Sequence, residues 1–171
     1  MERPKKNEYY HGYKPYVDLV KEGAFFDLLD ENTANTISLF KSINEKKWNF
    51  KYAEQKWTIK DVLMHIIDTE RGFSYRAIVC IREDSKTVLY AMDEDHYANN
   101  VDLTDVSMDQ LIDEFKAVRH TFKLIYVNNP KAKFEFLGSG TTDKISARAI
   151  GYIAIGHVIH HCQVIQERYL K

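Results

Sequence analysis

The stretch IGYIAIGHVIHHCQVI, residues 150–165, decides the fold class of this chain. Its apolar side chains spread around most of a helical axis, which is typical of a helix buried on nearly all sides. A histidine is costly to bury without a partner, yet the stretch carries three, at positions 157, 160 and 161. The sequence therefore predicts a central helix that carries a polar functional site.

Three earlier segments have the helical repeat of apolar residues needed to pack around that helix. Thr58 suits the start of one of them, because Asp61 three residues later completes a capping box. The four predicted helices span about 23–43, 58–81, 104 or 107 to 128, and 143 or 146 to 165. Residues 134–142 are predicted to form a loop with a short extended piece. Because at least two connections are long, the sequence predicts an all-α four-helix bundle with long connecting loops.

Length, charge and composition set the broad class of the protein. At 171 residues the chain is sized for a single domain, 1–171, with residues 1–20 as an N-terminal extension. The formal net charge of −1, from 24 Lys and Arg against 25 Asp and Glu, offers no field that would gather nucleic acid. No stretch approaches the roughly 18 apolar residues of a membrane span. With two cysteines and no apolar leader, we expect a cytoplasmic protein with neither a nucleic-acid nor a membrane partner.

Three histidines of this chain can form one metal site. His157 and His161 are spaced i, i+4, so a helix places them one turn apart on the same face. His65 is the lone histidine of the second predicted helix, and its apolar neighbours predict that it faces or borders the core. A catalytic zinc commonly takes three protein ligands and leaves one position for water or substrate. We therefore expect His65, His157 and His161 to bind a divalent metal ion. For His65 taken alone, a core histidine bonded to a carbonyl is the alternative.

Two stretches of the chain resemble the DinB-like (DinB/YfiT) superfamily of metal-binding four-helix-bundle proteins. They are WTIKDVLMHIIDTER, residues 57–71, and GHVIHHCQVI, residues 156–165. The resemblance, which extends from the first helix to Lys171, implies an up-down-down-up bundle, a metal held by three histidines, and a homodimer. His65 matches the family ligand on the second helix, and His157 and His161 match the pair on the last helix. Characterised relatives include transferases and isomerases that use low-molecular-weight thiols.

The ligand set leaves the metal and one histidine open. Imidazole nitrogen suits several divalent ions, so we expect Zn or Ni, while Fe, Mn and Cu are also compatible. His160 lies i, i+3 from His157, and the spacing alone also allows it to be a ligand. The family pattern favours His161 as the ligand, which leaves His160 as a group lining the site or as a packed polar residue.

Other polar residues near the predicted ligands have two interpretations each. Asp68 and Glu70 follow His65 by three and five residues and are candidates, with His160, for a catalytic group. Ion pairs on the helix surface or between helices, with Arg71 and Arg76 as partners, are the alternative. In the long connection, Glu94 and His96 either close over the site as lid residues or remain solvated.

These features predict a divalent-metal-dependent enzyme that acts on a small molecule. Thiol-dependent S-transfer follows from the resemblance, with a low-molecular-weight thiol as partner, and hydrolysis would use the same parts. The alternative is a non-enzymatic metal-binding or ligand-sensing bundle. In that case a fourth side chain, such as His160 or Cys162, would close the coordination sphere.

Overall fold

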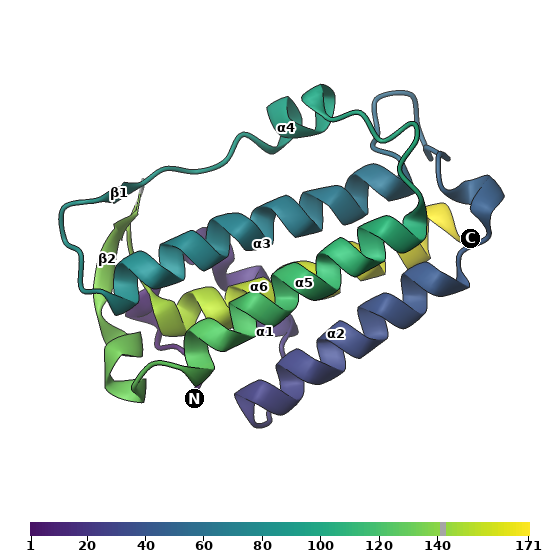
Figure 1. Ribbon diagram of the computed structural model, residues 1–171. Helices are drawn as coiled ribbons and strands as arrows, with labels where there is room; N and C mark the ends of the chain where they lie inside the picture. The colour runs from purple at the N-terminus through teal and green to yellow at the C-terminus, as the bar shows by residue number, and fades with distance from the viewer. Residues whose placement is uncertain (141–142) are drawn as a thin grey trace.

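Four long helices form the body of the protein in a computed structural model that describes residues 1–140 and 143–171. They are α2 (Phe25–Ser42), α3 (Ile59–Ile81), α5 (Met108–Val127) and α6 (Ala147–Val164). Helices α3 and α5 run in one direction, and α2 and α6 in the other (Figure 1). The predicted up-down-down-up four-helix bundle is confirmed.

Side-chain caps define where the long helices begin. Thr58 accepts a hydrogen bond from the Asp61 amide at 3.1 Å, and the Asp61 carboxylate accepts one from the Thr58 amide at 2.8 Å. Ser107 forms the same reciprocal cap with Gln110 at the start of α5, and the Ser146 hydroxyl accepts from the Ala149 amide at the start of α6. The later of the two predicted starts is therefore correct for both helices. Each cap satisfies amide groups that the first turn of a helix leaves unpaired.

Helix α6 is the most deeply buried element, as its apolar sequence predicts. Every residue from Ala147 to Val158 is buried, and the helix packs against both α2 and α3. Two apolar clusters fill the bundle, one toward the start of α6 and the other toward its end. His157 is a buried polar residue on this helix, so its imidazole lies inside the apolar bundle.

Several short elements accompany the long helices, and none of them except β2 was predicted. The extra helices are α1 (Lys14–Leu19) and α4 (Glu94–Asn100), and a three-stranded sheet consists of β1 (Val88–Leu89), β2 (Leu137–Gly140) and β3 (Lys144–Ser146). Strand β2 lies in the middle, parallel to β1 and antiparallel to β3, with Gly138 opposite Ile145. Single helical turns cover Lys6–Glu8, His11–Tyr13, Glu45–Lys47 and Lys131–Glu135, and a π-helical turn covers Ile165–Tyr169. Strand β2 is the predicted extended piece; residues 141–142 of that predicted loop lie outside the described residues.

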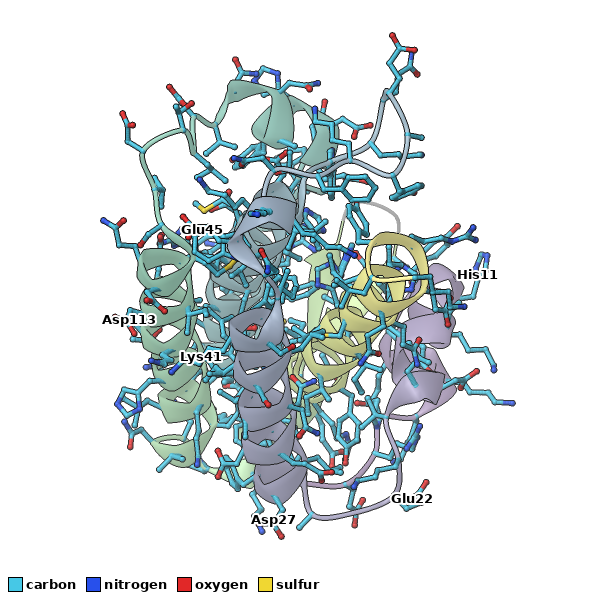
Figure 2. The ribbon with its side chains drawn as sticks, turned by 90° about the vertical axis from the view of Figure 1, so that its right-hand side faces the viewer. His11, Glu22, Asp27, Lys41, Glu45 and Asp113 are labelled. Carbon is cyan, nitrogen blue, oxygen red and sulfur yellow. The ribbon has the colours of Figure 1, made fainter. Side chains whose placement is uncertain are left out.

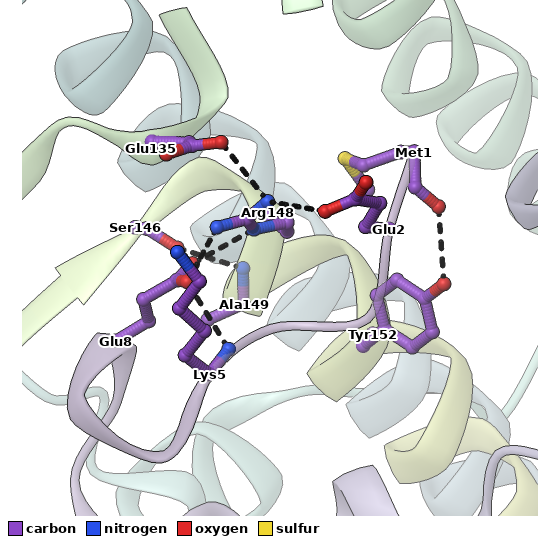
Figure 3. A network of polar contacts seen from close by, with 9 residues as sticks. All are labelled: Met1, Glu2, Lys5, Glu8, Glu135, Ser146, Arg148, Ala149 and Tyr152. Atoms are coloured by element: carbon purple, nitrogen blue, oxygen red, sulfur yellow. Dashed lines mark hydrogen bonds and ion pairs between the residues drawn. The ribbon is translucent and has the colours of Figure 1, made fainter. Parts of the chain in front are cut away.

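The N-terminal segment is tied to the bundle by a buried ion pair (Figure 3). The Nε of Arg148 donates to Glu8 at 2.9 Å, and the Ser146 hydroxyl donates to the same carboxylate at 2.8 Å. Glu135 accepts a further bond from Arg148 at 3.1 Å. The tyrosine hydroxyl of Tyr152 donates to the carbonyl of Met1. Residues before α2 therefore pack along α6 and form part of the folded unit.

Charged side chains lie on the outside of the bundle. Figure 2 shows Asp27 and Lys41 projecting from α2 and Asp113 from α5, and all three are exposed. Across residues 1–140 and 143–171, none of the helices combines the length and the apolarity needed to cross a membrane.

Candidate metal centre

Three histidine side chains from two helices converge on one point. His65 lies on α3, His157 and His161 lie one turn apart on α6, and α3 packs directly against α6. The Nε2 atom of His157 is 3.0 Å from the Nε2 of His65 and 3.0 Å from the Nε2 of His161. The three ligand nitrogens all lie within 4.8 Å of one another. The structure thus brings together the three residues that the sequence proposed as ligands.

Hydrogen bonding alone cannot account for this arrangement. A neutral imidazole nitrogen carries either one N–H or one lone pair, so the Nε2 of His157 can form one directed hydrogen bond and not two. Both neighbouring nitrogens nevertheless approach it to 3.0 Å in a buried place. Three lone pairs directed at a shared cation would satisfy all three nitrogens at once. The donor set therefore fits a divalent metal ion.

Burial keeps these imidazoles in the neutral form that a metal requires. It lowers the pKa of His65 to about 4, against a small opposing effect of Asp95. Burial, reinforced by the neighbouring imidazoles, lowers the pKa of His161 to about 3. The pKa of His157 falls well below its ordinary value for the same reasons, and the nearby Arg119 charge adds to the effect. At neutral pH the lone pairs are therefore free to bind a cation.

Aromatic rings hold the histidines in place. The Trp57 ring lies 4.7 Å from the ring of His65, and the Phe73 ring meets His157 edge-on at 6.0 Å. Tyr16 packs edge-on against both His157 and His160 at 5.6 Å. Such contacts restrict the rotation of the imidazoles and exclude water from one side of the site.

Helix α1 reaches the site because α6 has a glycine there. A Cβ atom at Gly156 would lie 1.9 Å from the carbonyl oxygen of Tyr16 and 2.5 Å from its carbonyl carbon. Any side chain at position 156 would collide with backbone, so only glycine permits α1 to cross α6 at this height. This contact places the Tyr16 ring beside His157.

A cavity of about 330 Å³ opens beside the three histidines. The wall away from the histidines comes from α1 and the turn before it, from α3, and from the connection into α4 together with its first residue. Its lining residues are Tyr13, Tyr16, Trp57, His65, Thr69, Gly72, Phe73, Arg76, Ala91, Met92, Glu94, His157 and His161. A small molecule can therefore reach the nitrogens from one side.

The predicted catalytic carboxylates lie elsewhere. Asp68 pairs with Arg71 at 3.0 Å, and Glu70 is buried in the bundle interior 2.8 Å from Arg119. Burial raises the pKa of Glu70 to about 7, although the Arg119 charge opposes the rise. Neither carboxylate lines the cavity, although Asp68 borders a smaller hollow beside His65 and Glu94. Both form ion pairs, which is the alternative that the sequence left open.

The remaining two polar candidates on α6 lie beside the ligand set rather than in it. His160 is half-buried and packs on Tyr16 and on the ring of His161. The Cys162 thiol lies 3.7 Å from the hydroxyl of Thr36 on α2. In the described part of the chain, the metal-binding group consists of the three histidines without a fourth side chain.

Glu94 is the carboxylate that the cavity does contain. Glu94 is the first residue of helix α4. Asp93 caps this helix, because its carboxylate accepts a hydrogen bond from the amide of His96. Glu94 and Tyr16 line the same cavity, and burial together with the Glu94 charge raises the pKa of Tyr16. Glu94 and His96 are both exposed, but His96 does not line the cavity, and its carbonyl accepts a hydrogen bond from the Asn100 side chain. Of the two predicted lid residues, Glu94 therefore lines the site and His96 does not.

Arg76 and the tyrosines Tyr13 and Tyr16 also line the cavity and were not predicted to do so. For Arg76 a signal existed in the sequence, because positions 65, 69, 72 and 76 fall on one face of a helix. The sequence analysis assigned Arg76 to an ion pair, but no carboxylate within the described residues pairs with it. Tyr16 lies on the unpredicted helix α1 and Tyr13 on the single turn before it, so neither had such a signal.

Comparison with known proteins identifies the family. The model of the DinB superfamily matches residues 28–165 of this sequence. The chain belongs to the DinB superfamily. The resemblance in the two histidine-bearing stretches is thereby confirmed.

The architecture of this DinB protein is similar to that of a solved structure. YfiT from Bacillus subtilis, described as a probable metal-dependent hydrolase with an unusual four-helix bundle topology, superimposes with a TM-score of 0.74. The match covers 97% of this chain and 90% of YfiT at 12% sequence identity, which establishes a common fold. No curated protein sequence matches the chain.

Proposed function

We propose that this DinB protein is a metal-dependent enzyme in which His65, His157 and His161 hold a divalent cation facing the cavity. The observation that carries the proposal is that the Nε2 of His157 lies 3.0 Å from the Nε2 of His65 and 3.0 Å from the Nε2 of His161. Zn²⁺ or Ni²⁺ suits this donor set. The description of YfiT as a probable metal-dependent hydrolase agrees with it.

The number of ligands favours a catalytic metal over a structural one. A structural zinc ion normally has four protein ligands, whereas a catalytic ion has three and an open position. Here three histidines form the described group, Cys162 faces Thr36, and His160 packs on Tyr16. The open side of the histidine group is the side on which the cavity lies.

The residues around the histidines supply the other parts of a reaction. A divalent cation lowers the pKa of a thiol or a water and so provides a nucleophile near neutral pH. Glu94 is the carboxylate among the described lining residues, and it can accept the proton that the nucleophile loses. Tyr16, Trp57 and Phe73 pack around the imidazoles and limit the access of bulk water.

We assign thiol transfer as the reaction and a low-molecular-weight thiol as the co-substrate. The sulfur forms a bond to an electrophilic carbon, the bond from that carbon to its leaving group breaks, and the thiol proton passes to Glu94. Hydrolysis is the second candidate, because YfiT is described as a hydrolase and water could take the place of the thiol.

Metal analysis tests the site. Protein purified without added metal should contain about one metal ion per chain by mass spectrometry, and His65→Ala, His157→Ala and His161→Ala should each lose it. His160→Ala should retain the metal, and His120→Ala on the exposed face of α5 is the matched control. Full metal occupancy in both His65→Ala and His157→Ala would refute the site.

A screen of electrophiles against several small thiols and water then tests the reaction. Glu94→Gln should retain the metal and lose about a hundredfold in rate, as removal of a general base does. Turnover with water alone would favour hydrolysis. A metal-loaded protein that turns over none of these substrates would favour a binding or sensing protein instead.

A further inference from the structure

A second and larger cavity lies between α2 and α6, with a volume of about 640 Å³. Its lining on α2 extends from Leu28 to Ser42, which corresponds to about 21 Å of helix. Leu19, at the end of α1, and the two residues after it close one end of the cavity. Cavities that hold small molecules commonly measure about 300–1,000 Å³, so this one has the volume of a ligand site.

This cavity, the α2–α6 cavity, is separate from the metal cavity. Its lining on α6 follows one face of the helix and includes Ile155, Ile159, Cys162 and Gln166. His157 follows Ile155 by two residues, which turns its side chain by about 200° around the helix axis. The two cavities therefore lie on opposite faces of α6, and none of the residues that line one also lines the other.

The α2–α6 cavity offers no free charge to a ligand among the described residues that line it. Lys21 and Glu31 pair with each other at 2.7 Å. Arg119, whose charge reaches Cys162, is buried and pairs with Glu70 at 2.8 Å. The other polar groups at the mouth are exposed amides and hydroxyls, on Asn35, Ser38, Ser42, Gln163 and Gln166. An ionised ligand would lose its hydration without gaining a partner, so the cavity favours an uncharged one.

A buried amide lies in the floor of this cavity. Asn32 and Thr36 are one turn apart on α2 and are 8% and 1% exposed. The Thr36 hydroxyl is satisfied, because it donates to the carbonyl of Asn32 at 2.7 Å. The side-chain oxygen of Asn32 is buried and has no hydrogen-bond partner in the described part of the chain. An unpaired polar group in this position destabilises the protein, and a ligand that pairs with it removes that cost.

The chemistry of Asn32 defines what would pair with it. A carboxamide carries an acceptor and two N–H donors side by side, and its terminal torsion is soft, so either end can turn toward the cavity. The complementary group has an N–H next to a carbonyl, as in another carboxamide or a lactam. Apolar side chains of Leu28, Leu39, Ile155 and Ile159 surround this position and suit a hydrocarbon body.

We propose that the α2–α6 cavity is a second binding site, for an uncharged organic amide whose amide group pairs with Asn32 and whose apolar body packs between α2 and α6. The site uses none of the residues of the metal centre and so goes beyond the proposed function. Its recessed, hydrogen-bonding floor distinguishes it from a face that packs flat against another protein.

Equilibrium dialysis of the full-length protein against three probes of one shape tests the proposal. 2-Naphthamide has the N–H and the carbonyl, 2-acetonaphthone has the carbonyl alone, and 2-naphthoate is an anion. The amide should bind about fivefold more tightly than the ketone, which lacks the N–H, and at least about tenfold more tightly than the anion.

Variants of the cavity identify the contact. Asn32→Leu should abolish the preference for the amide over the ketone and leave the affinity for the ketone unchanged. This variant should fold, because an apolar side chain of similar size replaces an unpaired polar one. Asn99→Leu on the exposed helix α4 is the matched control and should behave as the unaltered protein. Asn35→Trp at the mouth should weaken the binding of both uncharged probes.

The outcomes separate this site from the metal centre. Removal of the metal should leave the affinity for 2-naphthamide unchanged, and loss of binding with the metal would overturn the proposal. Failure of 2-naphthamide to bind, equal affinity for all three probes, or an unchanged preference in Asn32→Leu would overturn it as well. A dimer by light scattering that Asn35→Trp converts to a monomer would assign the cavity to a second copy of the chain instead.

Discussion

Substitution of Gly156 by alanine should destabilise the protein through a single backbone contact. The added Cβ would lie 1.9 Å from the Tyr16 carbonyl oxygen, so α1 must move away from α6. Helix α1 packs against α6 through Val17, which is 2% exposed, and Val20 beside it is equally buried. Complete exposure of both would cost about 3–6 kcal/mol at roughly 1.5–3 kcal/mol for each side chain.

The expected loss in the free energy of unfolding is smaller than the cost of exposing both valines completely. A site that receives one extra methyl group usually relaxes at a cost of about 1–3 kcal/mol, and alanine regains up to about 1 kcal/mol of helix propensity over glycine. We therefore expect Gly156→Ala to lose about 2 kcal/mol in the free energy of unfolding. With a urea dependence of about 2 kcal/mol per molar, the unfolding midpoint should fall by about 1 M.

Gly72 provides the matched control for this substitution. It lies inside α3 and lines the metal cavity, but a Cβ there would meet nothing within 4 Å. Gly72→Ala should therefore raise the free energy of unfolding by about 0.5–1 kcal/mol through helix propensity alone. Urea unfolding of the metal-free proteins, followed by circular dichroism, measures both changes. A midpoint for Gly156→Ala equal to or above that of the unaltered protein would refute the close approach of α1.

Two further predictions concern ionisable groups. In the metal-free protein, burial lowers the pKa of His65 to about 4 and that of His161 to about 3. Both lie below the value of about 6.5 in the unfolded chain. As the pH falls, the unfolded chain therefore binds more protons than the folded protein does. The free energy of unfolding, followed by thermal unfolding, should therefore fall by about 1 kcal/mol per histidine between about pH 7.5 and pH 5.5 and continue to fall toward pH 4. A stability that does not change with pH over this range would contradict neutral buried imidazoles. Glu8→Ala should cost about 3 kcal/mol, because it leaves the guanidinium of Arg148, 5% exposed, without its main buried partner. The control Glu22→Ala removes a carboxylate that is 91% exposed and paired with Arg3, and its urea midpoint should barely change; equal losses in the two variants would refute the N-terminal anchor.

Local patterns predicted the long helices and the histidines because both depend on short sequence spacing. The capping pair of Thr58 and Asp61 lies within one turn, and the apolar repeat of α6 continues through its whole length. The i, i+4 spacing of His157 and His161 follows from helix geometry alone. The meeting of His65 with that pair is different, since 92 residues separate it from His157 and only the packing of α3 on α6 joins them.

Tertiary structure determines which residues form the cavity wall, and the physical reason differs from residue to residue. Helix α1 has six residues, too few for an apolar repeat to be visible, and it reaches the site because Gly156 leaves room for the Tyr16 carbonyl. Strand β1 has only two residues and exists through pairing with β2, about fifty positions later. Glu70 and Glu94 have the same side chain, yet Glu70 faces Arg119 in the interior and Glu94 faces the cavity. The sequence by itself determined which side chains can bind a metal and which helices carry them. Only tertiary packing decided which carboxylate joins Arg76 in the cavity, because Glu94 and α3 lie on segments that no local repeat connects.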